Sequence, residues 1–180
     1  MASDIAGKEQ KCPTFSEPPF MANCGIDVAG MTLKHILPKL TGNNLKQKVN
    51  DWQTYGQLKE IDQTEFKTSE LLDDTGYLFV PNTCEKKKDC NLHVVLHGCS
   101  QGREVIGTDF VTNSGYLEWA ASNDIVLLFP YAKSVPKANP NGCWDFYGFS
   151  GKDYCTKDGT HPRSIAKMVW RLQECKNASL

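Results

Sequence analysis

A histidine and a glycine, His97 and Gly98, directly follow the apolar run 92–96. This run predicts a buried strand, because most of its residues are large and apolar. A glycine at the end of a strand lets the chain turn sharply, so the next backbone N–H, that of Cys99, can point at a developing negative charge. Such donors form an oxyanion hole, which stabilises the transition state of acyl transfer. We therefore predict ester chemistry, with Cys99 as a backbone oxyanion donor and His97 as a support for the loop.

A serine in the same loop offers a second interpretation. Residues 98–102 have the sequence Gly-Cys-Ser-Gln-Gly, which formally matches the G-x-S-x-G pattern of a nucleophile elbow. In such an elbow the serine occupies a tight turn between a strand and a helix. We expect no helix directly after Gly102, and His97 precedes the pattern. An oxyanion loop is therefore favoured over a nucleophilic Ser100.

A histidine and a tryptophan in the following long loop are further candidates. His161 could serve Ser100 as a base, and Asp145 or Asp158 could orient it. We instead expect His161 to be a surface residue at the start of a helix. Trp144 could form a platform for a sugar or a polyester. A hydrophobic plug over the loop explains this tryptophan equally well.

The bulk composition excludes several classes of partner. The chain has 180 residues, 40% hydrophobic residues and a formal net charge of −1, which fits one domain with a substantial core. The balanced charge argues against nucleic acid and anionic membranes as partners. No apolar run reaches the ~18 residues that cross a bilayer. Residues 1–7 lack the basic flank and the apolar segment of a secretory signal.

Eight cysteines are many for a protein of a reducing compartment. A zinc site is the rival explanation, but no C-x-x-C pair exists and the histidines lack ligand spacing, so no metal is expected. The cysteines therefore predict disulfides and an extracellular protein. Since no secretory signal accompanies them, we expect the natural N-terminus to lie upstream. The expected disulfides are Cys12–Cys24, Cys84–Cys90, Cys99–Cys143 and Cys155–Cys175.

The hydrophobic pattern predicts a single α/β domain over residues 1–180. Residues 1–56 are expected to form a loop and a helix with Asp27 as N-cap. Residues 57–180 are expected to form a β-hairpin and then a βαβα core. Two of its strands are apolar on both sides, which is typical of parallel sheets covered by helices. The expected elements are a helix over 27–40, strands over 57–67, 76–80, 92–96 and 124–129, a helix capped by Asn113 or Ser114, and a helix from Pro162.

Several segments together resemble one known family. They are residues 74–81, 92–101, 112–120 and 139–145, preceded by the stretch 24–30. In this order and spacing they resemble the C-terminal half of extracellular, fungal-type poly(3-hydroxybutyrate) depolymerases, which are circularly permuted α/β hydrolases. The resemblance covers roughly residues 12–172. It implies an incomplete α/β-hydrolase-type lobe with a mostly parallel sheet, flanking helices and an N-terminal hairpin. It also implies a polyester or other ester substrate, an acyl-enzyme and no cofactor.

The resemblance further implies which part of the active site lies in this chain. In the permuted family the nucleophile, the acid and the catalytic histidine precede the segment that opens this chain. The 180 residues would then be inactive alone and would need an N-terminal half. Cys99 would be an oxyanion donor, and Trp144, Asn141 and Tyr131 would line the substrate groove. The nucleophile strand would lie beside strand 124–129, which we therefore expect at the edge of the sheet.

Two other functions stay open. A non-catalytic secreted binding module could keep the same fold, the disulfides and the aromatic groove. A compact serine hydrolase could use Ser100 as its nucleophile, which predicts that a fluorophosphonate labels this residue.

Overall fold

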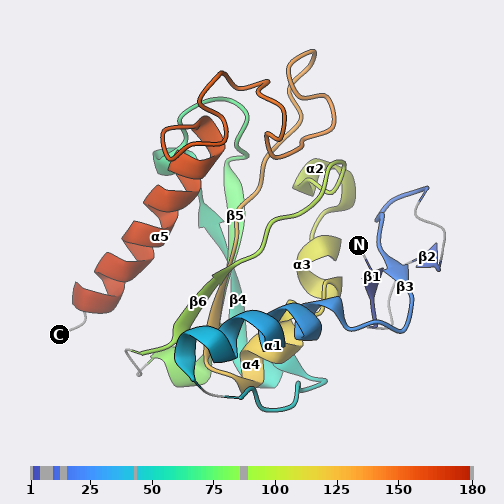
Figure 1. Ribbon diagram of the computed structural model, residues 1–180, viewed down its shortest axis with the longest axis vertical. Helices are drawn as coiled ribbons and strands as arrows, with labels where there is room; N and C mark the ends of the chain where they lie inside the picture. The colour runs from blue at the N-terminus through green and yellow to red at the C-terminus, as the bar shows by residue number, and fades with distance from the viewer. Residues whose placement is uncertain (1, 5–9, 13–15, 43, 86–88, 179–180) are drawn as a thin grey trace.

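The computed structural model describes residues 2–4, 10–12, 16–42, 44–85 and 89–178 (Figure 1). A four-stranded sheet of order β4-β5-β7-β6 forms its centre. Its strands are β4 (Gly56–Asp62), β5 (Thr75–Pro81), β6 (Asn91–Val94) and β7 (Ile125–Phe129). The predicted hairpin is confirmed, since β4 and β5 pair antiparallel. The sheet is mixed: β7 also pairs antiparallel with β5, and the parallel pairing expected for most of the sheet joins β6 to β7.

Strand β7 lies inside the sheet, so the expectation that it forms an edge was wrong. β5 flanks it on one side and β6 on the other. Its apolar run reflects this position, because four of its five residues are fully buried. Every second residue (Ile125, Leu127, Phe129) enters one hydrophobic cluster, and Leu128 enters another on the opposite face. The edges of the sheet are β4 and β6.

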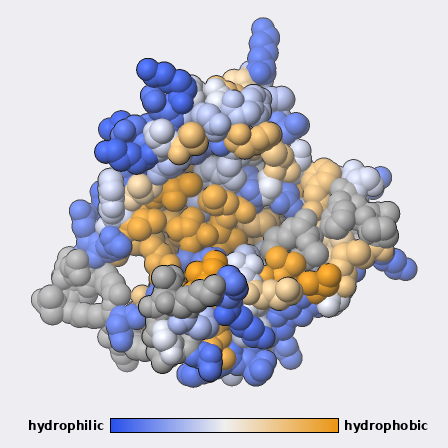
Figure 2. Space-filling model, in the orientation of Figure 1, coloured by the Kyte–Doolittle hydropathy of each residue, from blue (hydrophilic) through white to orange (hydrophobic). Residues whose placement is uncertain are grey.

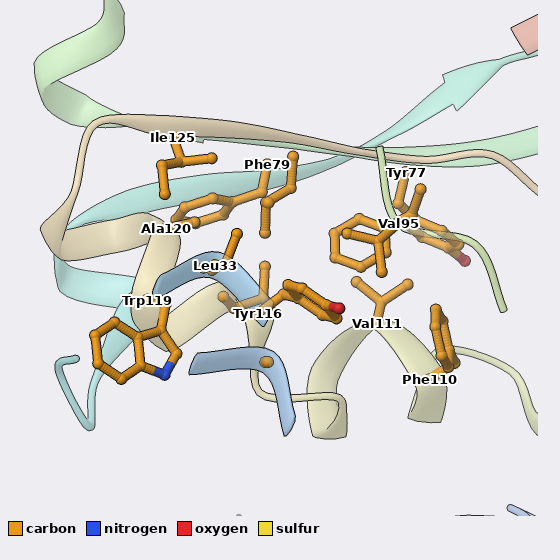
Figure 3. Packing of buried hydrophobic residues seen from close by; sticks show 14 of the residues in the cluster. Leu33, Tyr77, Phe79, Val95, Phe110, Val111, Tyr116, Trp119, Ala120 and Ile125 are labelled. Atoms are coloured by element: carbon orange, nitrogen blue, oxygen red, sulfur yellow. The ribbon is translucent and has the colours of Figure 1, made fainter. Parts of the chain in front are cut away.

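Helices cover the two faces of the sheet. On one face lie α1 (Val28–Thr41), α2 (Arg103–Ile106), α3 (Asp109–Asn113) and α4 (Tyr116–Ser122), whose apolar residues form the larger cluster with β5 and β7 (Figure 3). On the other face α5 (Thr160–Ala178) contributes Met168 to the smaller cluster. A sheet covered on both faces is the arrangement that its doubly apolar strands require.

Two helix starts test the capping predictions. Asp27 is the N-cap of α1 as predicted, and its carboxylate accepts from the Gly30 N–H at 2.7 Å. The same carboxylate accepts from the Trp119 indole N–H at 2.8 Å, which ties α1 to α4. The predicted cap of α4 was wrong. Gly115, with φ +88°, is its N-cap, because the chain must turn through the left-handed region between α3 and α4.

The N-terminal segment contains a small sheet that the sequence did not predict. The two-residue strands β1 (Ala2–Ser3) and β2 (Gln10–Lys11) pair in parallel with β3 (Ala22–Asn23), in the order β1-β3-β2. Strands this short have no alternation that a pattern could detect. Among the described residues, no helix is both long and apolar enough to cross a membrane.

Three of the four expected disulfides are present. They are Cys12–Cys24, Cys84–Cys90 and Cys99–Cys143. The fourth was wrong, because Cys155 is exposed with a free thiol. The side chain of Cys175 lies outside the described part of the chain. Its position is about 22 Å along α5 from Thr160, so the loop of Cys155 would have to run back along the helix to reach it.

Candidate functional site

The loop after β6 is fastened to a second loop that follows β7. Cys99 and Cys143 join them through a disulfide with a Cα–Cα distance of 4.3 Å. The Ser100 N–H donates to the Asn141 carbonyl at 2.7 Å, beside the disulfide. Gly142 makes the turn there with φ +56°. These two links hold the backbone of residues 97–102 in one conformation.

His97 fixes the peptide unit between Gly98 and Cys99. The ring is buried, and its Nε2 accepts from the Ala132 N–H at 3.1 Å. An accepting Nε2 carries no hydrogen, so the ring is neutral with its hydrogen on Nδ1, and burial, which lowers the pKa of His97, favours this form. Nδ1–H therefore donates to the Gly98 carbonyl at 2.8 Å. Since a trans peptide is planar, holding this carbonyl also fixes the direction of the Cys99 N–H, which points the opposite way.

The backbone amides of Gly98, Ser100 and Gln101, on either side of Cys99, are engaged. The Gly98 N–H donates to Gln101 Oε1 at 2.8 Å, and the Gln101 N–H donates to the Gly98 carbonyl at 3.2 Å. The Ser100 N–H is taken by Asn141. Within the described chain no hydrogen bond engages the N–H of Cys99, which is an exposed residue. A fixed and unengaged donor at the end of a strand is what an oxyanion hole requires.

Gln101 is the residue of this site that the sequence did not predict. Its side chain is 4% exposed. Besides holding the Gly98 N–H, it donates through Nε2 to the carbonyls of Pro19 and Phe20, at 3.1 and 3.2 Å. It therefore links the oxyanion loop to the N-terminal segment. No local pattern could reveal this role, because its partners lie some eighty residues away in the chain.

Ser100 lies on a tight turn but has no base. Its φ is +59°, and α2 begins directly after Gly102, so the expectation that no helix follows was wrong. The turn thus has a strand before it and a single helical turn after it. However, within the described residues the Ser100 hydroxyl makes no hydrogen bond, and both ring nitrogens of His97 are occupied by backbone groups. The geometry gives Ser100 no activating partner.

His161 is buried, so its predicted surface position was wrong. Its Nδ1 accepts from the Asp145 N–H at 3.0 Å. In a catalytic triad this nitrogen would instead donate to a carboxylate. The Asp145 carboxylate is occupied by four backbone amides of residues 147–150 and by the Ser150 hydroxyl. Asp158 is exposed. The arrangement does not form the triad that the Ser100 hypothesis needs.

The sequence and the fold both point to one group of proteins. No protein-family model matches the chain. A poly(3-hydroxybutyrate) depolymerase of Delftia acidovorans is 35% identical over 156 residues, which are 86% of this chain and 30% of that protein. A polyhydroxybutyrate depolymerase of Talaromyces funiculosus is 34% identical, with 94% of this chain and 52% of that protein covered.

Two solved structures agree. The crystal structure of PHB depolymerase from Penicillium funiculosum is 31% identical, with a TM-score of 0.79 over 93% of this chain and 54% of that one. A serine-to-alanine variant of a PHB depolymerase complexed with an R3HB trimer is 30% identical, with a TM-score of 0.84 over 96% of this chain and 56% of that one. This chain is related to the polyhydroxybutyrate depolymerases. It spans about half or less of the length of the relatives that it matches.

The groove residues predicted for a depolymerase-like site differ in exposure. Asn141 is exposed beside the oxyanion loop. Trp144 is half-buried between two histidine rings, with centroid distances of 5.5 Å to His97 and 5.0 Å to His161. Tyr131 is fully buried and stacks on His97 at 4.8 Å, so it does not line a surface groove. Tyr131 lies two residues after the buried strand β7 and is itself part of the larger hydrophobic cluster.

Proposed function

We propose that this chain supplies the oxyanion side of a carboxylic ester hydrolase site of the depolymerase type. The observation that carries the proposal is the unengaged Cys99 N–H, whose peptide is held by His97 while the neighbouring amides are occupied. In the proposal the nucleophile, base and acid come from residues outside these 180. Two observations support an external nucleophile: Ser100 has no base beside it, and His161 Nδ1 accepts from the Asp145 N–H instead of donating to a carboxylate.

The chemistry follows from the geometry of the loop. When a hydroxyl attacks the ester carbon, its carbonyl oxygen gains negative charge, and the Cys99 N–H donates to it. A donor fixed in advance costs no reorganisation during the reaction. The hydrogen bond from His97 to the Gly98 carbonyl polarises the same peptide unit, which strengthens the N–H donor. In the proposal the base from the other part takes the hydroxyl proton and returns it to the leaving alkoxide, so an alcohol departs and an acyl-enzyme remains, which water hydrolyses.

The proposed substrate is an ester of hydroxy acids. One related structure is complexed with an R3HB trimer, and both curated relatives are named as polyhydroxybutyrate depolymerases. The three disulfides support an extracellular protein, because such bonds persist in oxidising surroundings.

The test combines the chain with the part of the Talaromyces funiculosus depolymerase that lies outside the matched 52%. We expect the combination to hydrolyse p-nitrophenyl butyrate, and the chain alone to remain at background. Gln101→Ala frees the Gly98 amide and loosens the oxyanion peptide, so kcat should fall about ten- to hundredfold with little change in KM. Gln57→Ala, which removes an exposed amide side chain on β4, is the control.

A contradicting result is equally clear. If the chain alone hydrolyses the ester, and a fluorophosphonate labels it at Ser100 but not in Ser100→Ala, the chain is a compact serine hydrolase instead. If Gln101→Ala leaves the kcat of the combination unchanged, the loop does not provide the oxyanion donor.

A second candidate, a binding module, is favoured by an aromatic loop. Phe146 and Tyr147 are 67% and 64% exposed and contact each other edge to face. Asp145 gathers the amides of this loop and so presents both rings rigidly to solvent. If the chain binds polyester films, Phe146→Ala with Tyr147→Ala should abolish adsorption. The matched change Trp170→Ala, at an exposed tryptophan of α5, should leave adsorption intact.

A further inference from the structure

Trp144 is a predicted groove residue whose indole is held by packing alone. Its Nε1–H is buried and makes no hydrogen bond within the described chain. The ring centroid lies 5.5 Å from that of His97 and 5.0 Å from that of His161. The contact with His161 is edge to face, at an interplanar angle of 76°. The orientation of the indole therefore depends on these neighbours, because no polar contact fixes it.

His161 also holds the backbone of Trp144. Its Nδ1 accepts from the Asp145 N–H at 3.0 Å. This N–H and the Trp144 carbonyl belong to one planar peptide unit, so an acceptor on the N–H fixes the orientation of both. His161 thus acts on Trp144 twice, at the ring and at the following peptide. His97 instead directs both of its ring nitrogens to other backbone groups.

The helix start that carries His161 is fastened to the rest of the lobe. The Thr68 hydroxyl donates to the Thr160 carbonyl, at the first residue of α5, at 3.0 Å. Further along α5 the buried Met168 enters the smaller cluster, against which Trp144 also packs. The His161 side chain is itself 3% exposed. A side chain held in this way is a rigid support for its neighbour.

The indole lies beside the candidate oxyanion donor. Trp144 directly follows Cys143, which a disulfide joins to Cys99. Its side chain is half-buried, so part of it faces solvent. Figure 2 shows hydrophobic surface at the centre of the view, below the loops after β7 that Figure 1 draws at its top. An aromatic ring at this place can contact the apolar part of an ester whose carbonyl reaches the Cys99 N–H.

We propose that His161 is a positioning residue for substrate binding, which holds the Trp144 indole in the groove beside the oxyanion loop. This rests on the proposed function, because the groove belongs to the same ester site. The two buried histidines then have separate tasks. His97 supports the peptide of the oxyanion donor, and His161 supports the aromatic ring that contacts the acyl chain. Loss of His161 should therefore weaken substrate binding and spare the reaction step.

The kinetic test uses the chain combined with the unmatched part of the Talaromyces funiculosus enzyme. His161→Ala removes both contacts with Trp144 and should raise KM for p-nitrophenyl butyrate about fivefold, with kcat changed less than about twofold. His161→Asn places an amide oxygen near the position of Nδ1. It keeps an acceptor for the Asp145 N–H and should bring KM back to within about twofold. His35→Ala, at an exposed histidine of α1, is the matched control and should leave KM unchanged.

A second test follows the indole without using activity. The indole N–H of Trp144 in the full chain is assigned by NMR with Trp144→Phe, and its hydrogen exchange is measured. His161→Ala should speed this exchange at least about tenfold, because the ring loses its support. The indole of Trp119, which is buried and donates to Asp27 at 2.8 Å, is the internal control. Its exchange should stay unchanged.

Other outcomes overturn the inference. Equal acceleration at both indoles would show that His161 stabilises the whole fold instead. A fall in kcat at constant KM would assign His161 to the reaction step. A KM of His161→Asn as high as that of His161→Ala would show that the hydrogen bond from Asp145 does not position the ring. A combination that hydrolyses no ester would contradict the proposed function, and the exchange of the Trp144 indole would then decide the positioning role by itself.

Discussion

Two short loops of this chain are each organised by one polar side chain, with opposite results. In residues 145–150 the Asp145 carboxylate collects the backbone amides of four successive residues. In residues 97–102 the Gln101 amide holds the Gly98 N–H, and the Cys99 N–H is left without a partner in the described chain. The first loop therefore directs four of its amides to a carboxylate of its own. In the second loop the unengaged N–H belongs to a peptide whose carbonyl is held by a buried histidine, which is the arrangement that a candidate oxyanion site needs.

The histidines that contact the two loops, His97 and His161 of α5, also differ. Each is buried, and each accepts one backbone N–H, from Ala132 at His97 and from Asp145 at His161. The other nitrogen of His97 donates to the peptide that carries the candidate donor. The other nitrogen of His161 is buried without a hydrogen bond of normal geometry, although the Leu71 backbone is close enough to act on its pKa. Burial alone therefore does not indicate which histidine serves the site.

The largest expected effect comes from removing the support of the oxyanion peptide. In the combined enzyme, His97→Ala should lower kcat about 10²- to 10³-fold, which is the usual loss for one oxyanion donor. His161→Ala should lower it far less, because His161 holds the loop of Asp145. Steady-state kinetics on p-nitrophenyl butyrate measure both. Equal losses would erase the distinction between the two histidines.

The disulfides should rank by the length of chain that they close. Cys99 and Cys143 are 44 residues apart, so replacing both by alanine should lower the free energy of unfolding by about 4 kcal/mol. Cys84 and Cys90 are six residues apart, and the same change there should cost about 2 kcal/mol. Urea unfolding of the two double variants measures the difference. A smaller loss for the longer loop would mean that the linked loops hold together without their disulfide.

The loop of Asp145 should depend on pH at acid values. Burial alone would raise the pKa of Asp145, but hydrogen bonds from the Ser150 hydroxyl and the backbone amides outweigh it and lower the pKa below its usual range. The stabilisation is therefore present above about pH 4 and is lost as the pH falls through the lowered value. Asp145→Asn should cost about 1 kcal/mol at pH 7 and less at pH 2. Chemical denaturation at both pH values gives the comparison, and a constant difference would contradict it.

Glu118 should give a pH dependence of the opposite sign. Burial raises its pKa to about 7, so the folded chain prefers the protonated form. Its contribution to stability is complete below about pH 4 and declines as the pH rises through 7. Glu118→Gln should therefore gain stability relative to the wild type between pH 5 and pH 8. The melting temperatures of the wild type and of Glu118→Gln at pH 5 and pH 8 test this prediction. An equal change of both melting temperatures between the two pH values would refute it.

The sequence predicted the helices and strands better than it predicted which strands lie side by side. The runs 92–96 and 124–129 were recognised as strands because their residues are apolar, and Asp27 was recognised as a cap. The central place of β7 was not predicted, because strand order depends on pairing between distant segments. The helical turn α2 was missed because four residues show no periodicity.

The candidate site was predicted in outline only. The His-Gly pair after a strand indicated the loop, and the loop is where that pattern placed it. However, groups far along the chain, such as the carbonyl of Asn141, determine which amides of the loop are hydrogen-bonded. The burial of His161 was also hidden, because a histidine before a proline at a helix start has no apolar pattern around it. Contacts of this kind follow from the tertiary structure alone.

The most direct measurement is a crystal structure of the combined enzyme with a phosphonate that mimics the tetrahedral intermediate. If the Cys99 N–H is the oxyanion donor, a phosphonyl oxygen will lie about 2.7–3.1 Å from the Cys99 nitrogen. The phosphorus will then be bound to a nucleophile outside these 180 residues. Phosphorus bound to Ser100 Oγ, or a phosphonyl oxygen turned away from Cys99, would contradict the account.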